Sequence, residues 1–202
     1  MSGSPHFLAP TGMATVYRAT LEALARYGPR RAGVTHIARL ADTNKMFVYR
    51  NWSSPQALIR DATQAELKRL LQTACEVPGP LPPPGCLSVR IVVRATRLLR
   101  EHPVVRALAL NEPALAHMAV LRPTTVWHDT AWQWLTAHVT AHLPRGAEQE
   151  AAALAVLTTT LPYALTPPQA SPDPAADSTA IDRRLALATH ACLGLPPVCP
   201  NC

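Results

Sequence analysis

Lysine, aromatic residues and long apolar runs are all scarce in this chain of 202 residues. Lys45 and Lys68 are the only lysines, and Phe, Trp and Tyr together make up 5% of the sequence. No window approaches the roughly 18 consecutive apolar residues that a membrane-spanning helix needs. The first ten residues lack the basic and apolar regions of a secretion signal. We therefore expect a soluble, unexported protein with a cytoplasmic location and no membrane partner.

Signals of metal, disulfide or catalytic chemistry are also weak. The five cysteines are an odd number without a secretion signal, so we expect them to be reduced. Cys199 and Cys202 form a single CxxC, and one such pair without a second is weak evidence for zinc. The sequence has no HExxH, no phosphate-cradling glycine loop and no nucleophile with a neighbouring base. We expect no metal, no cofactor and no enzymatic activity.

Apolar residues recur at helical spacing throughout the chain, whereas strict alternation of apolar and polar residues never lasts long enough to predict a strand. The predicted fold class is therefore all-α. We expect a three-helix head at residues 13–53 and a larger helical body at residues 54–195, with residues 1–12 and 196–202 as flexible ends. The net charge of +6 is carried almost wholly by arginine, which suits a polyanionic partner.

Two short helices joined by a tight turn define the head. Residues 34–41 and 46–52 each place apolar side chains on one face, and such a pair predicts a helix-turn-helix over about residues 34–53. Asp42 occupies the turn position that needs a left-handed backbone, which aspartate tolerates. Asn44 is expected to cap the second of these helices, and Ser54 the helix that follows.

The sequence IARLADTNKMFVYRNW at residues 37–52, followed by Ser54 and ALI at 57–59, resembles the DNA-binding head of the tetracycline-repressor family of transcriptional regulators. TLEALARYG at residues 20–28 resembles that family's first helix and its terminal glycine. The resemblance covers about residues 16–59. It implies a DNA-binding head, and a helical body that binds an effector between its middle helices and dimerises.

The resemblance also implies DNA contacts from the second helix of the motif. Tyr49 matches a tyrosine that contacts the DNA backbone, and Lys45 matches a lysine that contacts phosphates or bases. Asparagine can pair with adenine, and an apolar side chain such as that of Met46 or Phe47 can touch a thymine methyl group. The alternative for these two residues is a place in the core. The expected DNA-binding residues are Asn44, Lys45, Met46, Phe47, Tyr49, Arg50 and Asn51.

Three positions depart from the family pattern. Asp42 replaces the turn glycine, Ala32 and Gly33 replace hydroxyl residues that open the second helix, and Pro55 replaces a phosphate-contacting lysine. These changes imply fewer backbone contacts to DNA. The arginines that could substitute are Arg30, Arg31, Arg39 and Arg50.

The helix predicted for residues 124–143 holds three of the four tryptophans of the chain. Small-molecule pockets combine mainly apolar walls with a few polar groups, which this helix can supply. The alternative is that each of these side chains belongs to the core. The expected effector-binding residues, for a hydrophobic ligand, are Met118, Trp127, Trp134 and His138.

Small residues recur at helical spacing in the last two predicted helices, and small side chains let helices approach closely. Two such helices from each of two subunits would form a four-helix interface. The expected interface residues are Ala151, Leu154, Ala155, Thr158, Leu185 and Ala188. In the helix predicted for residues 87–100, Arg90, Arg94 and Arg97 are expected to form a solvated face.

Together these features predict a homodimeric, ligand-responsive repressor that binds a pseudo-palindromic operator and is released by a small hydrophobic effector. One alternative is a redox- or metal-responsive regulator that uses His138 with His142, or Cys199 with Cys202. Another is a small-molecule binding protein or enzyme whose head no longer binds DNA specifically.

Overall fold

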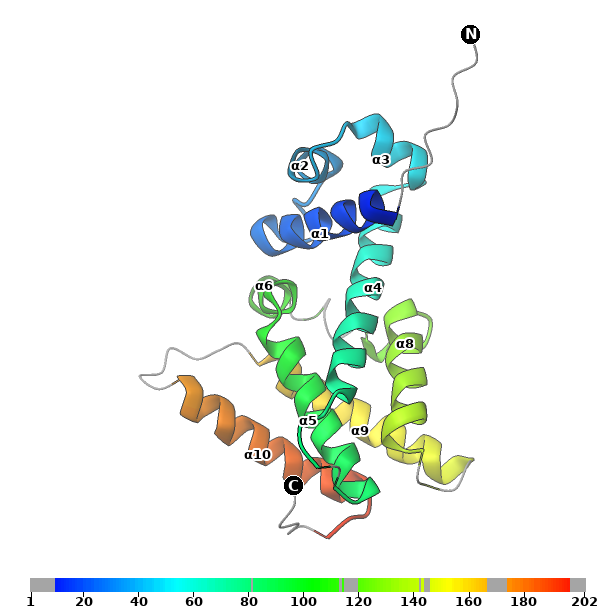
Figure 1. Cartoon of the computed structure of the whole chain (residues 1–202), viewed down its shortest axis with the longest axis vertical. Coiled ribbons are helices and arrows are strands. Elements are labelled where there is room, and N and C mark those ends of the chain that lie inside the picture. The colour runs from blue at the N-terminus through cyan, green and yellow to red at the C-terminus, as the bar shows by residue number, and fades with distance from the viewer. Residues whose placement is uncertain are drawn as a thin grey trace. The chain divides into compact units, whose positions relative to one another are not determined.

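The computed structural model describes residues 10–80, 82–112, 114, 120–141, 143, 146–166 and 174–196. Within these ranges every regular element is a helix and no strand is present, which confirms the predicted all-α class (Figure 1). No helix of the described ranges combines the length and the apolar character of a membrane span.

The chain divides into two compact units, one ending at Ala65 and the other starting at Glu66. The division falls within helix α4 (Pro55–Cys75), the helix beside which the sequence predicted the head to end. We call the first unit the head and the second the body.

The head contains helices α1 (Pro10–Tyr27), α2 (Val34–Leu40) and α3 (Lys45–Asn51), and the start of α4. Helix α1 begins at Pro10, so residues 10–12 are helical rather than part of a flexible arm. Residues 1–9 and 197–202, also expected to be flexible, lie outside the described ranges. Gly28 follows α1 with a positive φ of 74°, the conformation that commonly ends a helix.

The head core takes one large apolar side chain from each of its four helices. Leu24, Ile37, Val48 and Leu58 are all buried, and burying such a side chain contributes about 1.5–3 kcal/mol. The ring of Trp52, directly after α3, lies 6.0 Å from the ring of Tyr17 in α1.

The body holds the rest of α4 and the helices that follow. These are α5 (Pro84–Glu101), α6 (Pro103–Asn111), α8 (Val126–Trp134), α9 (Ala147–Leu165) and α10 (Pro174–Cys192). Helix α8 continues directly into a π-helical turn, η1 (Leu135–Val139). Helix α5 packs against α9, α10 and η1 (Figure 1). Its Val89 and Val92 share one buried core with Val139 and Val156.

Of the three α5 arginines expected to form a solvated face, Arg97 is exposed, whereas Arg90 and Arg94 are half-buried. Arg94 donates to a backbone carbonyl of α4 at 3.2 Å, and Arg97 Nε donates to Asp182 Oδ2 of α10 at 2.6 Å. Arg100, only 6% exposed, donates to Asp182 Oδ1 at 2.8 Å and to Ser178 Oγ at 3.1 Å. Asp182 is buried as well, so this ion pair is an internal link between α5 and α10.

Replacing Asp182 with alanine should destabilise the protein by about 3–5 kcal/mol, because Arg100 would stay buried without its counter-ion. Thermal unfolding followed by circular dichroism measures the effect. Glu101→Ala removes an exposed carboxylate at the end of α5 and serves as the control, with an expected change below about 0.5 kcal/mol. An Asp182→Ala variant as stable as wild type would show that the link contributes nothing.

His102 connects α6 to α4. Its Nδ1 accepts the Val104 N–H at 3.3 Å, capping α6, and its Nε2 lies 3.1 Å from Glu66 Oε1. A neutral ring with its hydrogen on Nε2 satisfies both contacts. Burial lowers the pKa of His102, and the Glu66 carboxylate opposes that shift only in part. For Glu66, burial acts to raise the pKa, but the bonded Arg69 and His102 lower it overall.

The folded state should therefore lose stability as pH falls from about 7 to 5, because the unfolded state binds a proton at His102 more readily. This contribution is fully present above the ordinary histidine pKa and is lost below it. His102→Asn retains a capping oxygen but does not titrate. The melting temperature of this variant should depend less on pH over that interval, whereas equal slopes in both proteins would exclude His102 as the cause.

Candidate functional site

The helix-turn-helix of the head is closed by a very short turn. The Thr43 N–H donates to Ala38 O at 2.9 Å, and Ala41 N–H donates to Ile37 O at 2.9 Å. Asp42 has φ 48°, which confirms the left-handed conformation predicted for it. Because so few residues separate the two helices, the direction in which α3 leaves α2 is fixed.

Both caps predicted for the head are present. Asn44 Oδ1 accepts the Phe47 N–H at 2.7 Å, and Ser54 Oγ accepts the Ala57 N–H at 3.1 Å. Asn51 Nδ2 donates to Phe47 O at 2.8 Å. Asn44 and Asn51 therefore support α3 itself.

The remaining predicted DNA contacts form an exposed face of α3. Met46 is 70% exposed, so it is not a core residue, while Phe47 is half-buried. Lys45, Tyr49 and Arg50 are exposed beside Met46. Lysine, arginine and tyrosine are the side chains that hold DNA phosphates. This face combines three polar donors with one long apolar side chain.

Exposed arginines also lie on α2 and in the loop before it. Arg39 of α2 is exposed, and its Nη2 donates to the Tyr27 hydroxyl at 3.1 Å. Arg31, in the loop before α2, is exposed too. Gly33 at the N-cap of α2 supplies no side-chain hydrogen bond, as the missing hydroxyl led us to expect. The head therefore carries cations on α2, α3 and the loop before α2, in addition to Arg18 and Arg26 of α1 and Arg60 of α4, of which Arg26 and Arg60 pair with Glu22 and Asp61.

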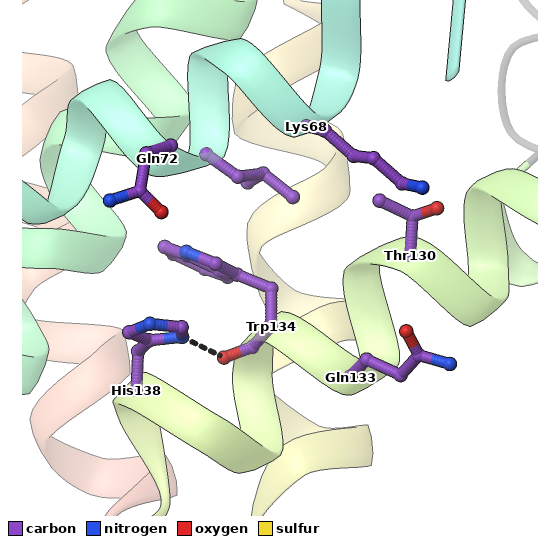
Figure 2. Close-up of a pocket in the computed structure, with 7 residues that line it drawn as sticks. Lys68, Gln72, Thr130, Gln133, Trp134 and His138 are labelled. Atoms are coloured by element: carbon purple, nitrogen blue, oxygen red, sulfur yellow. Dashed lines mark hydrogen bonds between the residues drawn. The ribbon is translucent and has the colours of Figure 1, made fainter. Parts of the chain in front are cut away.

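The body has a pocket of about 240 Å³ between α4 and the α8–η1 segment (Figure 2). Trp134 and His138 line it together, with ring centroids 6.1 Å apart and His138 Nδ1 3.1 Å from Trp134 O. Trp127 is not among the lining residues, and Met118 lies outside the described ranges. The lining residues are Lys68, Leu71, Gln72, Thr130, Gln133, Trp134 and His138. Five of these seven residues have polar side chains, although most of the surface that they present to the pocket is carbon.

The contribution of α4 to this pocket was missed from the sequence. Lys68, Leu71 and Gln72 are spaced i, i+3 and i+4 and so share one helix face, which is the signal that was available. Nothing in the sequence indicated that this face would meet α8.

The π-helical turn η1 was missed as well. Ser88 Oγ donates to Val139 O at 2.7 Å, and Gln149 Nε2 donates to Thr136 O at 3.3 Å and to Thr140 O at 3.1 Å. These side chains from α5 and α9 satisfy buried carbonyls around the wider turn. The turn that carries His138 is thus held from two neighbouring helices.

The predicted dimer residues of α9 lie largely on its open side. Ala151, Leu154 and Thr158 are exposed at helical spacing, and Ala155 is half-buried.

On α10 the prediction needs a correction. Leu185 is 0% exposed and packs inside the body, so it cannot contact another subunit. Leu187 is 50% exposed and is the large apolar side chain that α10 presents instead, while Ala188 is half-buried. The spacing of small residues predicted that this segment is a helix, but not which of its faces is turned toward the body.

Residues of the metal or redox alternative fall mostly outside the described ranges. This applies to His142, Cys199 and Cys202. Among the residues that the structure does describe, no group of three or more His, Cys, Asp and Glu side chains is placed to hold a metal ion.

Comparison of the chain with models of protein families and with curated protein sequences gave no match. A solved structure that it resembles is the crystal structure of a transcriptional regulator from Rhodococcus sp. Rha1. The similarity has a TM-score of 0.63 at 19% sequence identity, and covers 93% of this chain and 99% of the other. The two proteins therefore share a fold over nearly their whole lengths.

Asn44→Ala should destabilise α3 by about 1 kcal/mol, whereas Asn44→Ser, which keeps an accepting oxygen at the N-cap, should stay within a few tenths of wild type. Amide hydrogen exchange across α3 measures the difference. Equal protection in the two variants would show that capping is not the contribution of Asn44.

Proposed function

We propose that this chain is a transcriptional regulator that binds double-stranded operator DNA through α3. The exposed face of α3 carries the proposal, because Lys45, Tyr49 and Arg50 surround a Met46 side chain that has no place in the core. A helix presented by a short turn enters the major groove, where a few side chains reach base edges and others hold phosphates.

Two further observations support this proposal. Residues 37–52 resemble the DNA-binding head of the tetracycline-repressor family, and the structure shares its fold with a transcriptional regulator. The net charge of +6 also suits a polyanionic partner.

The proposal includes a homodimer formed through α9 and α10. Leu154 and Leu187 are exposed large apolar side chains on these helices. A helix-turn-helix dimer reads two half-sites about one helical turn apart, which converts a weak contact into a specific one. The expected operator is accordingly an inverted repeat.

The proposal also includes repression relieved by a small-molecule effector bound in the body. An effector needs only a different affinity for the two conformations to shift their populations. On this proposal the chain is a binding protein rather than an enzyme, needs no cofactor, and works in the cytoplasm.

Selection of bound sequences from a random DNA pool at near-physiological salt should enrich an inverted repeat. Lys45→Ala should weaken binding to that repeat about tenfold and reduce the salt slope by about one for each half-site. Tyr49→Phe, which removes only the hydroxyl, should weaken binding by about fivefold to tenfold.

Arg122→Ala, which removes an exposed cation from the body, is the control and should bind as wild type does. Failure to enrich any sequence, or wild-type affinity in both head variants, would contradict the DNA-binding proposal. Enrichment of a single half-site would contradict the homodimer.

A further inference from the structure

The body pocket contains a positive charge without a counter-ion. Lys68 is exposed in the pocket wall, and within the described part of the chain its ammonium group forms no ion pair. Among the residues that the structure describes, no carboxylate lines the pocket. Glu66, on the same helix, is bonded to Arg69 and His102. Asp129 of α8 lies 3.7 Å from the His128 ring. A ligand that enters this pocket therefore meets a cation that can pair with an anionic group.

An apolar surface lies beside this charge. Trp134 Nε1 donates to Cys75 Sγ at 3.3 Å, so the polar atom of the indole already has a partner. Figure 2 shows the Trp134 indole beside the His138 ring, with the side chain of Gln72 nearby and that of Lys68 extending toward Thr130. The half-buried indole therefore presents only its carbon atoms to the pocket. The aromatic ring of a ligand would pack well against it in an offset or edge-on arrangement.

The remaining polar groups of the pocket are two amides, one hydroxyl and one imidazole. Gln72 and Gln133 are exposed amides whose NH₂ groups can donate to an anion. Thr130 Oγ1 donates to Val126 O at 2.6 Å. His138 Nδ1 faces the Trp134 carbonyl and must donate to it, so the ring of His138 has a fixed tautomer when neutral.

The residues that line the pocket lie on helices that contacts with neighbouring helices hold in place, not on a loop. Ser88 and Gln149 fix the π-helical turn that carries His138, and π turns of this kind often occur at functional sites. Its volume of about 240 Å³ lies below the range of roughly 300–1,000 Å³ that drug-sized ligands occupy. A ligand of this volume has about one ring.

From this charge, surface and volume we infer that the body pocket binds a one-ring aromatic carboxylate. Its carboxylate pairs with Lys68 and its ring packs against Trp134 and Leu71. This inference rests on the proposed function, in which such a compound is the effector, and it narrows the small hydrophobic effector expected from the sequence to one that carries a carboxylate.

Isothermal titration calorimetry of the full chain tests the inference with benzoate, 4-hydroxybenzoate and phenylacetate as probes. A ligand of about ten non-hydrogen atoms is expected to bind with a Kd between micromolar and millimolar. Benzamide, which has the same shape without the charge, should bind at least about tenfold more weakly than benzoate. Lys68→Met should weaken benzoate binding by a similar factor, and Lys68→Arg should restore most of it. Arg122→Ala, an exposed cation outside the pocket, is the control.

The same preparations are tested for binding to the selected DNA, which separates this inference from the proposed function. Carboxylate binding that depends on Lys68 supports the inference whether or not the protein binds DNA. If the protein binds the carboxylate but not DNA, only the proposed function is overturned. DNA binding with no carboxylate bound at about 10 mM, well above the expected Kd, overturns the inference. Benzamide binding as tight as that of benzoate, or wild-type benzoate affinity in Lys68→Met, overturns it too.

Discussion

Helices α2 and α3 contain seven residues each, and this shortness is the constraint on which the candidate DNA interface depends. Isolated helices of fewer than about 12–15 residues are marginal in water, so these two persist only because Ile37 and Val48 are buried against the rest of the head. The short turn at Asp42 and the Asn44 cap determine where α3 begins. Since the buried side of α3 secures the helix, its outer side can carry residues that contribute nothing to folding.

The body is organised by polar contacts between distant segments. Asp182 joins α10 to Arg97 and Arg100 of α5, and Gln149 of α9 bonds the backbone around η1. Directed hydrogen bonds of this kind add a preferred orientation to the close packing of the apolar core. The helices that form the pocket and the exposed side of α9 are therefore held in one orientation by contacts inside the body.

Features that depend on residues within about four positions of each other could be predicted from the sequence. These include the left-handed Asp42, the caps at Asn44 and Ser54, and the end of α1 before Gly28. Features that depend on distant partners could not. The Arg97–Asp182 link spans 85 positions, and the pocket joins Lys68 to residues about 60 positions later. Periodicity identified α10 as a helix with one small-residue face, but the burial of Leu185 and exposure of Leu187 follow from its rotation against α5 and α9.

The two lysines of the chain occupy exposed positions in different units, Lys45 on α3 and Lys68 in the wall of the pocket. Acetylation and amine-directed reagents act on lysine and leave arginine unchanged. In this chain, the side-chain amines available to such chemistry therefore lie at the two candidate sites and nowhere else. Acetylation of the two amines would remove one positive charge from each site. One kind of covalent modification would therefore change both candidate sites at once, while the positive charge of the arginines would remain.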